Sequence, residues 1–263
     1  MHLLRRPLSL WTIAFLLTLA SAVYQRVTGP SYPARGSVRL AGAEIGFRLP
    51  RTQGDGDAVV SVAAPAGVQG SVSWKRFRSG DGWTTLPMER QGQLLAASLP
   101  HQPPAGKLAY RVVLTSGTER VALGGQAVVL RFKGEVPRAV LVVHIFCMFF
   151  GMLLSTRAGL EFFRPAPRYL TLILPTIGLL TVGGLLLGPI VQKHAFGAYW
   201  TGWPFGTDLT DNKTLVAWLG WVAAWLRIRR NPAAGAWALI AAAVTLIVFG
   251  IPHSMFGSEL KYD

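Results

Sequence analysis

Five long apolar runs separate the polar stretches of this chain, and four of them crowd its second half. They cover residues 8–24, 139–154, 170–191, 215–228 and 234–251. A bilayer hydrocarbon core about 30 Å thick is crossed by about 20 apolar residues in a helix. Backbone N–H and C=O groups find no water there, so each run should fold as a helix. The second, fourth and fifth runs reach spanning length only if interfacial residues such as Arg138, Trp237 and His253 form their ends.

Residues 33–134 have a different pattern, in which apolar and polar residues alternate over short segments. Such alternation is typical of strands that bury one face. The segments are 36–40, 44–49, 58–63, 71–77, 83–87, 93–98, 108–114, 120–123 and 126–132. Clusters of Gly, Pro, Asp and Ser separate them, for example at residues 54–57 and 79–82. Many short strands divided by turn residues predict an all-β sandwich.

The net charge of +14 is unevenly distributed and predicts an orientation in a membrane. Eight Lys and Arg residues and one acid fall within residues 1–7, 155–168 and 227–232, at alternate ends of the expected helices. Cytoplasmic loops of membrane proteins carry such an excess of basic residues. We therefore expect the N-terminus and these two loops in the cytoplasm, with residues 25–138, 192–214 and the C-terminal tail on the other side.

The first apolar run has two interpretations. Arg5-Arg6, the run itself and Ala20-Ser21-Ala22 together are similar to a secretory signal with its cleavage site. We expect the run to be retained as an N-terminal anchor, which gives five membrane spans. Cleavage would leave four spans, and the β region would face the same side in both cases.

One segment of the β region resembles a known type of domain. Residues 103–114, which include Tyr110, resemble the E–F corner and F strand of bacterial immunoglobulin-like and fibronectin-type-III-like domains. The resemblance implies that Tyr110 is the corner tyrosine, whose hydroxyl bonds back to the main chain, and that Trp74 is the core tryptophan. Such domains usually bind partners or act as spacers, and their fold alone implies no enzyme.

The apolar runs offer little chemistry. His144 is the only ionisable residue well inside a run, whereas a pump, channel or transporter is expected to need several buried acids or bases. Cys147 is the single cysteine, which excludes an intrachain disulfide and a thiolate zinc site. The sequence also shows no Gly-rich phosphate loop, Ser–His–Asp order or Cys–His pair. We therefore expect that the protein is not an enzyme.

Residues 194–213 form the densest unusual stretch, a predicted outer loop rich in aromatic residues and glycine. Aromatic residues gather at membrane interfaces, so one interpretation is a folded interfacial cap. The other is a docking surface for a polypeptide or a pigment-like ligand, because Tyr and Trp are favoured at binding hot spots. The residues predicted to bind a partner are Tyr199, Trp200, Trp203, Phe205, Asp208 and Asp211.

Three histidines, His144, His194 and His253, fall on the predicted outer side. Imidazole nitrogens bind copper, zinc and haem iron. No diagnostic spacing such as His-x-x-x-His accompanies these residues. The main prediction therefore includes no cofactor, and a haem or copper site built from the three histidines is the alternative.

Together these patterns predict a multi-pass α-helical membrane protein with an inserted all-β extracytoplasmic sandwich of the immunoglobulin-like class. The expected parts are an N-terminal anchor at residues 1–27, a periplasmic sandwich at 33–134, a four-helix transmembrane bundle at 138–252 and a periplasmic tail at 253–263. The expected location is the inner membrane of a bacterium.

The hypothesised function is that of a non-catalytic accessory or scaffolding subunit in a larger membrane complex, of the respiratory or photosynthetic kind. Its partners would be other integral-membrane subunits, a periplasmic protein surface and the lipid bilayer, and not nucleic acid; a bound lipid or pigment stays open. The alternative is a membrane redox protein that binds haem or a metal through the outer-side histidines. A sensor or assembly factor is a third hypothesis, but the inner loops are too short for a cytoplasmic signalling domain.

Overall fold

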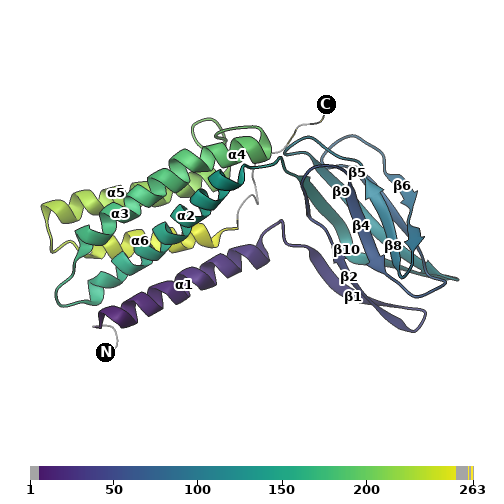
Figure 1. The fold of residues 1–263 in the computed structure, drawn as a ribbon, viewed down its shortest axis with the longest axis horizontal. Coiled ribbons are helices and arrows are strands. Elements are labelled where there is room, and N and C mark those ends of the chain that lie inside the picture. The colour runs from purple at the N-terminus through teal and green to yellow at the C-terminus, as the bar shows by residue number, and fades with distance from the viewer. Residues whose placement is uncertain (1–5, 253–259, 261, 263) are drawn as a thin grey trace. The chain divides into compact units, whose positions relative to one another are not determined.

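The computed structural model describes residues 6–252, 260 and 262, which form two compact units. The helical unit contains the chain up to Gly29, Val136–His194 and the residues from Ala198 through the last helix. The β unit contains Pro30–Glu135, Ala195–Gly197 and two tail residues, Leu260 and Tyr262. Each unit therefore combines segments that are far apart in the sequence (Figure 1).

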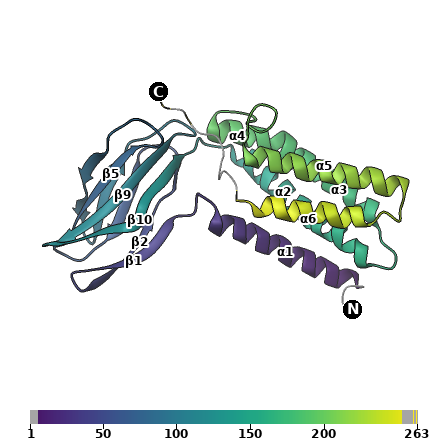
Figure 2. The same cartoon turned by 180° about the vertical axis from the view of Figure 1, so that it is seen from behind.

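The helices of the helical unit follow the apolar runs of the sequence. They are α1 (Pro7–Thr28), α2 (Arg138–Leu160), the short 3₁₀ helix η2 (Glu161–Phe163), α3 (Tyr169–Leu180), the π-helix η3 (Thr181–Leu187), α4 (Gly188–Phe196), α5 (Leu209–Arg230) and α6 (Ala236–Gly250). α3, η3 and α4 follow one another without a break and form one long helix. α1 packs beside α2 and α6, as both views of the ribbon show (Figure 1, Figure 2).

Three helical stretches are long and apolar enough to cross a membrane: Pro7–Thr28, Arg138–Phe163 and Tyr169–Phe196. They contain 22, 26 and 28 residues, and about 20 residues are needed for a span. α6 is apolar but has only 15 residues. α5 has 22 residues, but it carries charged side chains in its first and last turns. Length and composition therefore bear out three of the five expected spans.

α2 continues past the apolar run that predicts it, into residues expected to form an inner loop. The extension contains Arg157, which is buried and pairs with the buried Glu161 at 2.6 Å. Glu161 also accepts hydrogen bonds from the Arg164 guanidinium at 3.1 Å and from the Arg168 main-chain N–H at 2.6 Å. The expectation that Arg157 lies in a loop is wrong, because this carboxylate and its donors allow a charged residue to stay inside the helical unit.

Polar and small side chains join the helices in the middle of the helical unit. The fully buried Trp221 of α5 places its indole N–H 3.0 Å from Ser155 Oγ of α2 and 3.0 Å from Thr245 Oγ1 of α6. Gly159 of α2 lies against Ala242 of α6, where a larger residue would not fit. Small residues of this kind let two helices approach closely.

The described residues of the β unit contain three hydrogen-bonded sheets. The first is a hairpin of β1 (Ala34–Leu40) and β2 (Ala43–Leu49). The second has the strand order β3 (Thr52–Gln53), β10 (Glu119–Phe132), β9 (Lys107–Ser116), β5 (Gln69–Arg76) and β6 (Thr84–Pro87). The third has the order β4 (Ala58–Ala63), β8 (Leu94–Leu99) and β7 (Glu89–Gln91).

The three sheets share one apolar core. Tyr110 of β9 is completely buried in it, and its hydroxyl donates to the carbonyl of Pro50 at 2.7 Å. Burial raises the pKa of the Tyr110 phenol, so this group stays protonated and acts as the donor. Trp74 packs against the edge of the core and is half-buried.

Most predicted strands are present, with ends shifted by one or two residues. The two segments expected at 120–123 and 126–132 are instead one strand, β10, with a shift in register between Leu123 and Val128. Gly124 and Gly125 lie within this bulge with φ of 75° and 69°. Glycine adopts such a conformation at little cost, so the strand continues where a turn was expected.

The hydroxyl of Tyr110 can be tested by a minimal substitution. Tyr110→Phe keeps the ring but removes the donor to Pro50, whose carbonyl is then left without this partner. We expect the free energy of unfolding to fall by about 1–2 kcal/mol, measured as a lower thermal midpoint of the full chain in detergent. Tyr24→Phe is the control, because Tyr24 is 53% exposed. Equal midpoints for both variants would contradict the structural role of the hydroxyl.

Candidate functional site

A folded loop at residues 198–208 connects α4 to α5. The main-chain N–H groups of Phe205 and Gly206 both donate to the carbonyl of Gly202, at 2.9 Å each. The two bonds close a tight turn in the middle of the loop. This part of the chain is therefore structured, as its glycine and aromatic content predicts.

The carboxylate of Asp211 holds the loop against the first turn of α5. Asp211 is only 6% exposed. Its Oδ2 accepts hydrogen bonds from the main-chain N–H groups of Thr201 at 2.7 Å and Gly202 at 3.0 Å, and from Gln192 Nε2 of α4 at 3.2 Å. A buried carboxylate is stable only when donors surround it. The fold of the loop therefore depends on this side chain.

Asp208 is the N-cap of α5 and is 7% exposed. Its Oδ1 accepts from the Thr210 N–H at 2.7 Å, and its Oδ2 accepts from Thr201 Oγ1 at 3.1 Å. The first N–H groups of a helix lack partners within the helix, and an Asp at the N-cap supplies one. Asp208 and Asp211 therefore support the loop from within the chain. Their predicted contact with a partner stays a prediction.

The loop exposes three of its aromatic side chains. Tyr199 is 60% exposed, Trp203 is 69% exposed and Phe205 is 83% exposed. Trp200 is half-buried and donates its indole N–H to the Trp203 carbonyl at 3.0 Å. The Trp203 N–H donates to Asn212 Oδ1 at 2.7 Å. Large apolar side chains are therefore presented to the surroundings on a main chain that is fixed from both sides.

Lys213 is a buried charge that the sequence analysis did not single out. It is 3% exposed, and its Nζ donates to the carbonyl of Ile251 at 2.6 Å. Ile251 is the C-cap of α6, where carbonyls have no partner within the helix. Lys213 therefore joins the start of α5 to the end of α6. The sequence did offer a sign that Lys213 is buried, because it lies only two residues before the apolar run at 215–228.

His144 is half-buried on α2, and its Nδ1 lies 2.8 Å from the carbonyl of Gly183 in the π-helix η3. Because a carbonyl only accepts, Nδ1 carries a proton, and in the neutral ring Nε2 then has the free lone pair. His194 is exposed near the end of α4, and the third predicted ligand, His253, lies outside the described residues. Within residues 6–252, 260 and 262, no group of three or more His, Cys, Asp or Glu side chains could hold a metal ion.

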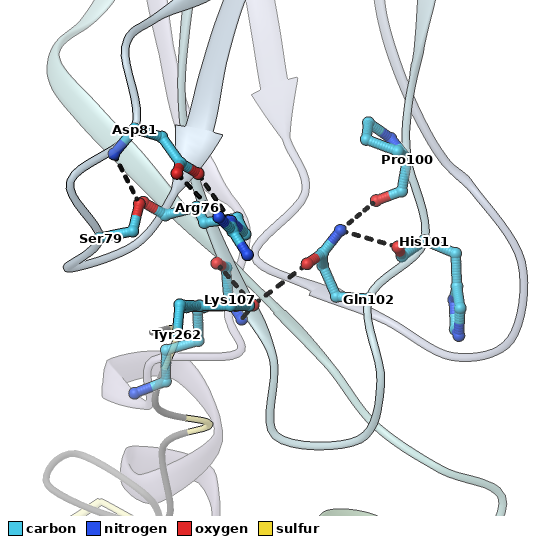
Figure 3. Close-up of polar contacts among 8 residues, drawn as sticks. All are labelled: Arg76, Ser79, Asp81, Pro100, His101, Gln102, Lys107 and Tyr262. Carbon is cyan, nitrogen blue, oxygen red and sulfur yellow. Dashed lines mark hydrogen bonds and ion pairs between the residues drawn. The ribbon is translucent and has the colours of Figure 1, made fainter.

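The β unit binds two residues of the C-terminal tail, Leu260 and Tyr262, of which Figure 3 shows Tyr262. The Leu260 N–H donates to the Ala105 carbonyl at 3.3 Å. The Tyr262 hydroxyl accepts from the Lys107 N–H at 3.0 Å, and its proton has two acceptors in reach, Gln102 Oε1 at 3.2 Å and the Lys107 carbonyl at 3.3 Å. Tyr262 and Lys107 are 155 positions apart, so no local pattern in the sequence predicts this contact.

Arg76 completes the surroundings of Tyr262. Its guanidinium carbon lies 4.9 Å from the centre of the tyrosine ring, and the guanidinium makes two hydrogen bonds to Asp81, at 2.7 and 2.9 Å. The hydrogen bond from Arg76 lowers the pKa of Asp81 to about 2. The same hydrogen bond to Asp81 raises the pKa of Arg76. Because the folded pKa of Asp81 is depressed, the pairing is fully present above about pH 4 and is lost as the pH falls toward 2.

No protein-family model, curated protein or solved structure matches this chain. Its function is therefore inferred from three local arrangements, namely the loop at residues 198–208, the His144 contact and the Tyr262 contact. Of these, the loop presents the largest exposed aromatic side chains, including Phe205 and Trp203.

The role of the Asp211 carboxylate can be tested by removing it. Asp211→Ala deprives the Thr201 and Gly202 N–H groups of their acceptor, so we expect both amides to exchange with deuterium at least about tenfold faster. Hydrogen–deuterium exchange with mass spectrometry measures this in the peptide that contains both residues. Thr207→Ala is the control, because Thr207 is exposed in the same loop. Unchanged exchange in Asp211→Ala would contradict the assigned role.

Proposed function

We propose that five helices of this chain cross the inner membrane of a bacterium, with the N-terminus in the cytoplasm and the β unit in the periplasm. Three helices long and apolar enough for a span support the proposal. So do the arginines that follow the apolar runs of α2 and α5, namely Arg157, Arg164, Arg168, Arg227, Arg229 and Arg230. An excess of basic residues at one end of successive helices is typical of the cytoplasmic side.

We further infer that the β unit is a sandwich of the immunoglobulin-like class. Its support is the apolar core shared by its sheets, with the buried Tyr110 of β9 bonded to the main chain. Domains of this class commonly bind other proteins or act as spacers. The β unit would then contact a periplasmic protein surface.

The function that the geometry supports best is that of a non-catalytic accessory subunit of a larger membrane complex, respiratory or photosynthetic. The observation that carries it is the fixed loop with its exposed Tyr199, Trp203 and Phe205. Exposed aromatic residues on a rigid main chain lose little conformational entropy on binding and are favoured at hot spots. The loop would dock against a neighbouring integral-membrane subunit.

The simpler role for these aromatic residues is an interfacial belt that touches only lipid. A belt needs aromatic rings at the right depth, but it does not need a fixed loop. Here the buried Asp211 carboxylate, the Asp208 cap and Asn212 all hold the main chain in place. Because binding another protein rewards such preorganisation, this network favours docking.

The proposal is tested by a triple variant of the exposed loop residues, with alanine at positions 199, 203 and 205. We expect the wild-type chain, purified from its native membrane in mild detergent, to carry other subunits at a fixed whole-number ratio. The triple variant should lose at least one of them, because its hot-spot side chains are gone. Native mass spectrometry measures the composition and the ratio.

Phe162→Ala combined with Phe163→Ala is the matched control, because these aromatic residues are also exposed, at 44% and 43%, but lie outside the loop. The control should keep every subunit. A wild-type chain that always migrates alone, or a triple variant with an unchanged complex, would contradict the proposal.

A second candidate is a redox protein with a haem or a copper ion bound through His144. The observation that favours it is the bond from Nδ1 to the Gly183 carbonyl, since metal-binding histidines usually donate their other ring nitrogen to such an acceptor. A haem absorption band or about one copper per chain in the purified protein, lost in His144→Ala and kept in His194→Ala, would support it. A colourless protein without bound copper would rule it out.

A further inference from the structure

The contact between Tyr262 and the β unit has the features of a binding site for a side chain. The hydroxyl of Tyr262 is both an acceptor, from the Lys107 N–H at 3.0 Å, and a donor, to Gln102 Oε1 at 3.2 Å or the Lys107 carbonyl at 3.3 Å. The Arg76 guanidinium covers the ring. Both the polar and the aromatic part of the tyrosine are therefore recognised (Figure 3).

The residues around the ring are held by contacts that do not involve the tail. Two hydrogen bonds to Asp81 fix the guanidinium of Arg76. Ser79 donates to the Arg76 carbonyl at 2.8 Å and accepts from the Asp81 N–H at 3.3 Å, which closes the turn between them. The site is thus preformed on one side by the end of β5 and the turn that follows it.

The other side of the site is also preformed. The Gln102 amide nitrogen donates to the carbonyls of Pro100 at 3.3 Å and His101 at 2.7 Å, so its Oε1 faces the tyrosine hydroxyl. Gly106 is required first by its own turn, because a Cβ there would lie 2.7 Å from Gln102 Cβ and 2.8 Å from the Pro103 carbonyl oxygen, and it would also lie 3.0 Å from the Tyr262 hydroxyl oxygen. These residues, together with Arg76 and Lys107, are called the tyrosine socket below.

We propose that the tyrosine socket is a recognition site for a peptide segment that carries a tyrosine, and that Tyr262 occupies it as a releasable plug. The ligand class is a short peptide with a free phenol, and the occupant to which we commit is the C-terminal segment of this same sequence. The Leu260 N–H adds one main-chain bond, to the Ala105 carbonyl, so a peptide is bound and not only a ring.

The attached tail should outcompete a free peptide. The stretch between α6, which ends at Gly250, and Tyr262 is short, and a short tether gives an effective concentration in the millimolar range. A free peptide at micromolar concentration therefore cannot displace the plug. The free peptide can bind only to a chain in which residue 262 has no phenol, such as Tyr262→Ala.

The test uses the full chain with Tyr262→Ala and a fluorescent octapeptide with the sequence of residues 256–263. We expect the variant to bind the peptide and the wild-type chain to bind it at least about tenfold more weakly, measured by fluorescence anisotropy. A second peptide with phenylalanine in place of the tyrosine should bind the variant about tenfold more weakly, because it lacks the hydroxyl and its two hydrogen bonds.

Two further substitutions in the Tyr262→Ala chain separate the socket from unspecific binding. Arg76→Ala removes the cation over the ring and should weaken binding of the tyrosine peptide by several-fold. Arg35→Ala is the control, because Arg35 stacks on Tyr32 instead. Absence of binding to Tyr262→Ala, or equal binding of the tyrosine and phenylalanine peptides, would overturn the proposal.

A second measurement does not depend on an emptied socket. In the wild-type chain the Lys107 N–H donates to the Tyr262 hydroxyl. Tyr262→Phe should therefore speed deuterium exchange at Lys107 by about tenfold, while Tyr32→Phe leaves it unchanged. Equal exchange at Lys107 in the wild type and Tyr262→Phe would show that the socket does not hold the phenol, and the proposal would fail.

Discussion

The helical unit depends on hydrogen bonds that satisfy three of its buried charged groups, Asp211, Glu161 and Lys213, from within the unit. Other buried polar atoms of the unit, such as Thr18 Oγ1 and Arg157 Nε, have no such partner. Helices of hydrocarbon length offer no water to an unpaired group, so each buried charge needs its own donors or acceptors. Asp211 receives main-chain N–H groups, Glu161 receives three donors, and Lys213 reaches a helix-end carbonyl. Asp211 lies in the first turn of α5, Lys213 lies in the second turn, and Glu161 follows the last residue of α2. The main-chain groups without helical partners are also found near helix ends.

The same constraint explains why the loop between α4 and α5 has a defined shape. A buried carboxylate such as Asp211 needs several donors, and the nearby turn of the loop provides them. Trp203 and Phe205 are exposed on the main chain that is fixed in this way. Stability of the helix end and display of the aromatic residues are therefore two results of one network.

Much of the fold is readable from the sequence, because alternation and apolar length report directly on burial. Most strands from Ala34 to Phe132 are found close to where period-two patterning predicts them, although β7 lies where no strand was predicted, and the apolar runs form helices. β3 is not predictable in this way, since a two-residue strand that pairs in parallel with β10 has no pattern of its own. The continuation of β10 through Gly124 was also missed, because a bulge and a turn use the same residues.

The candidate sites are only partly readable from the sequence. The aromatic content of the sequence indicated that the loop is a candidate site. The burial of Asp208 and Asp211 was not predictable, because it depends on which N–H groups the folded turn brings near their carboxylates. Arg157 was placed in a loop because the apolar run ends at residue 154, and the pairing with Glu161 that keeps it in α2 is visible only in the fold. The contact of Tyr262 joins distant parts of the chain, and only the folded β unit creates it.

The central claim is that the helical unit lies in a bilayer with the β unit on the periplasmic side. Because the chain has one cysteine, Cys147, a Cys147→Ser background allows single reporter cysteines to be placed at exposed positions. One reporter is Thr118→Cys, at an exposed position in the β unit. The other is Ala166→Cys, at an exposed position between α2 and α3. In intact spheroplasts a membrane-impermeant maleimide should label the first reporter and reach the second only after the membrane is opened. Labelling of Ala166→Cys in intact spheroplasts, or protection of Thr118→Cys, would contradict the account.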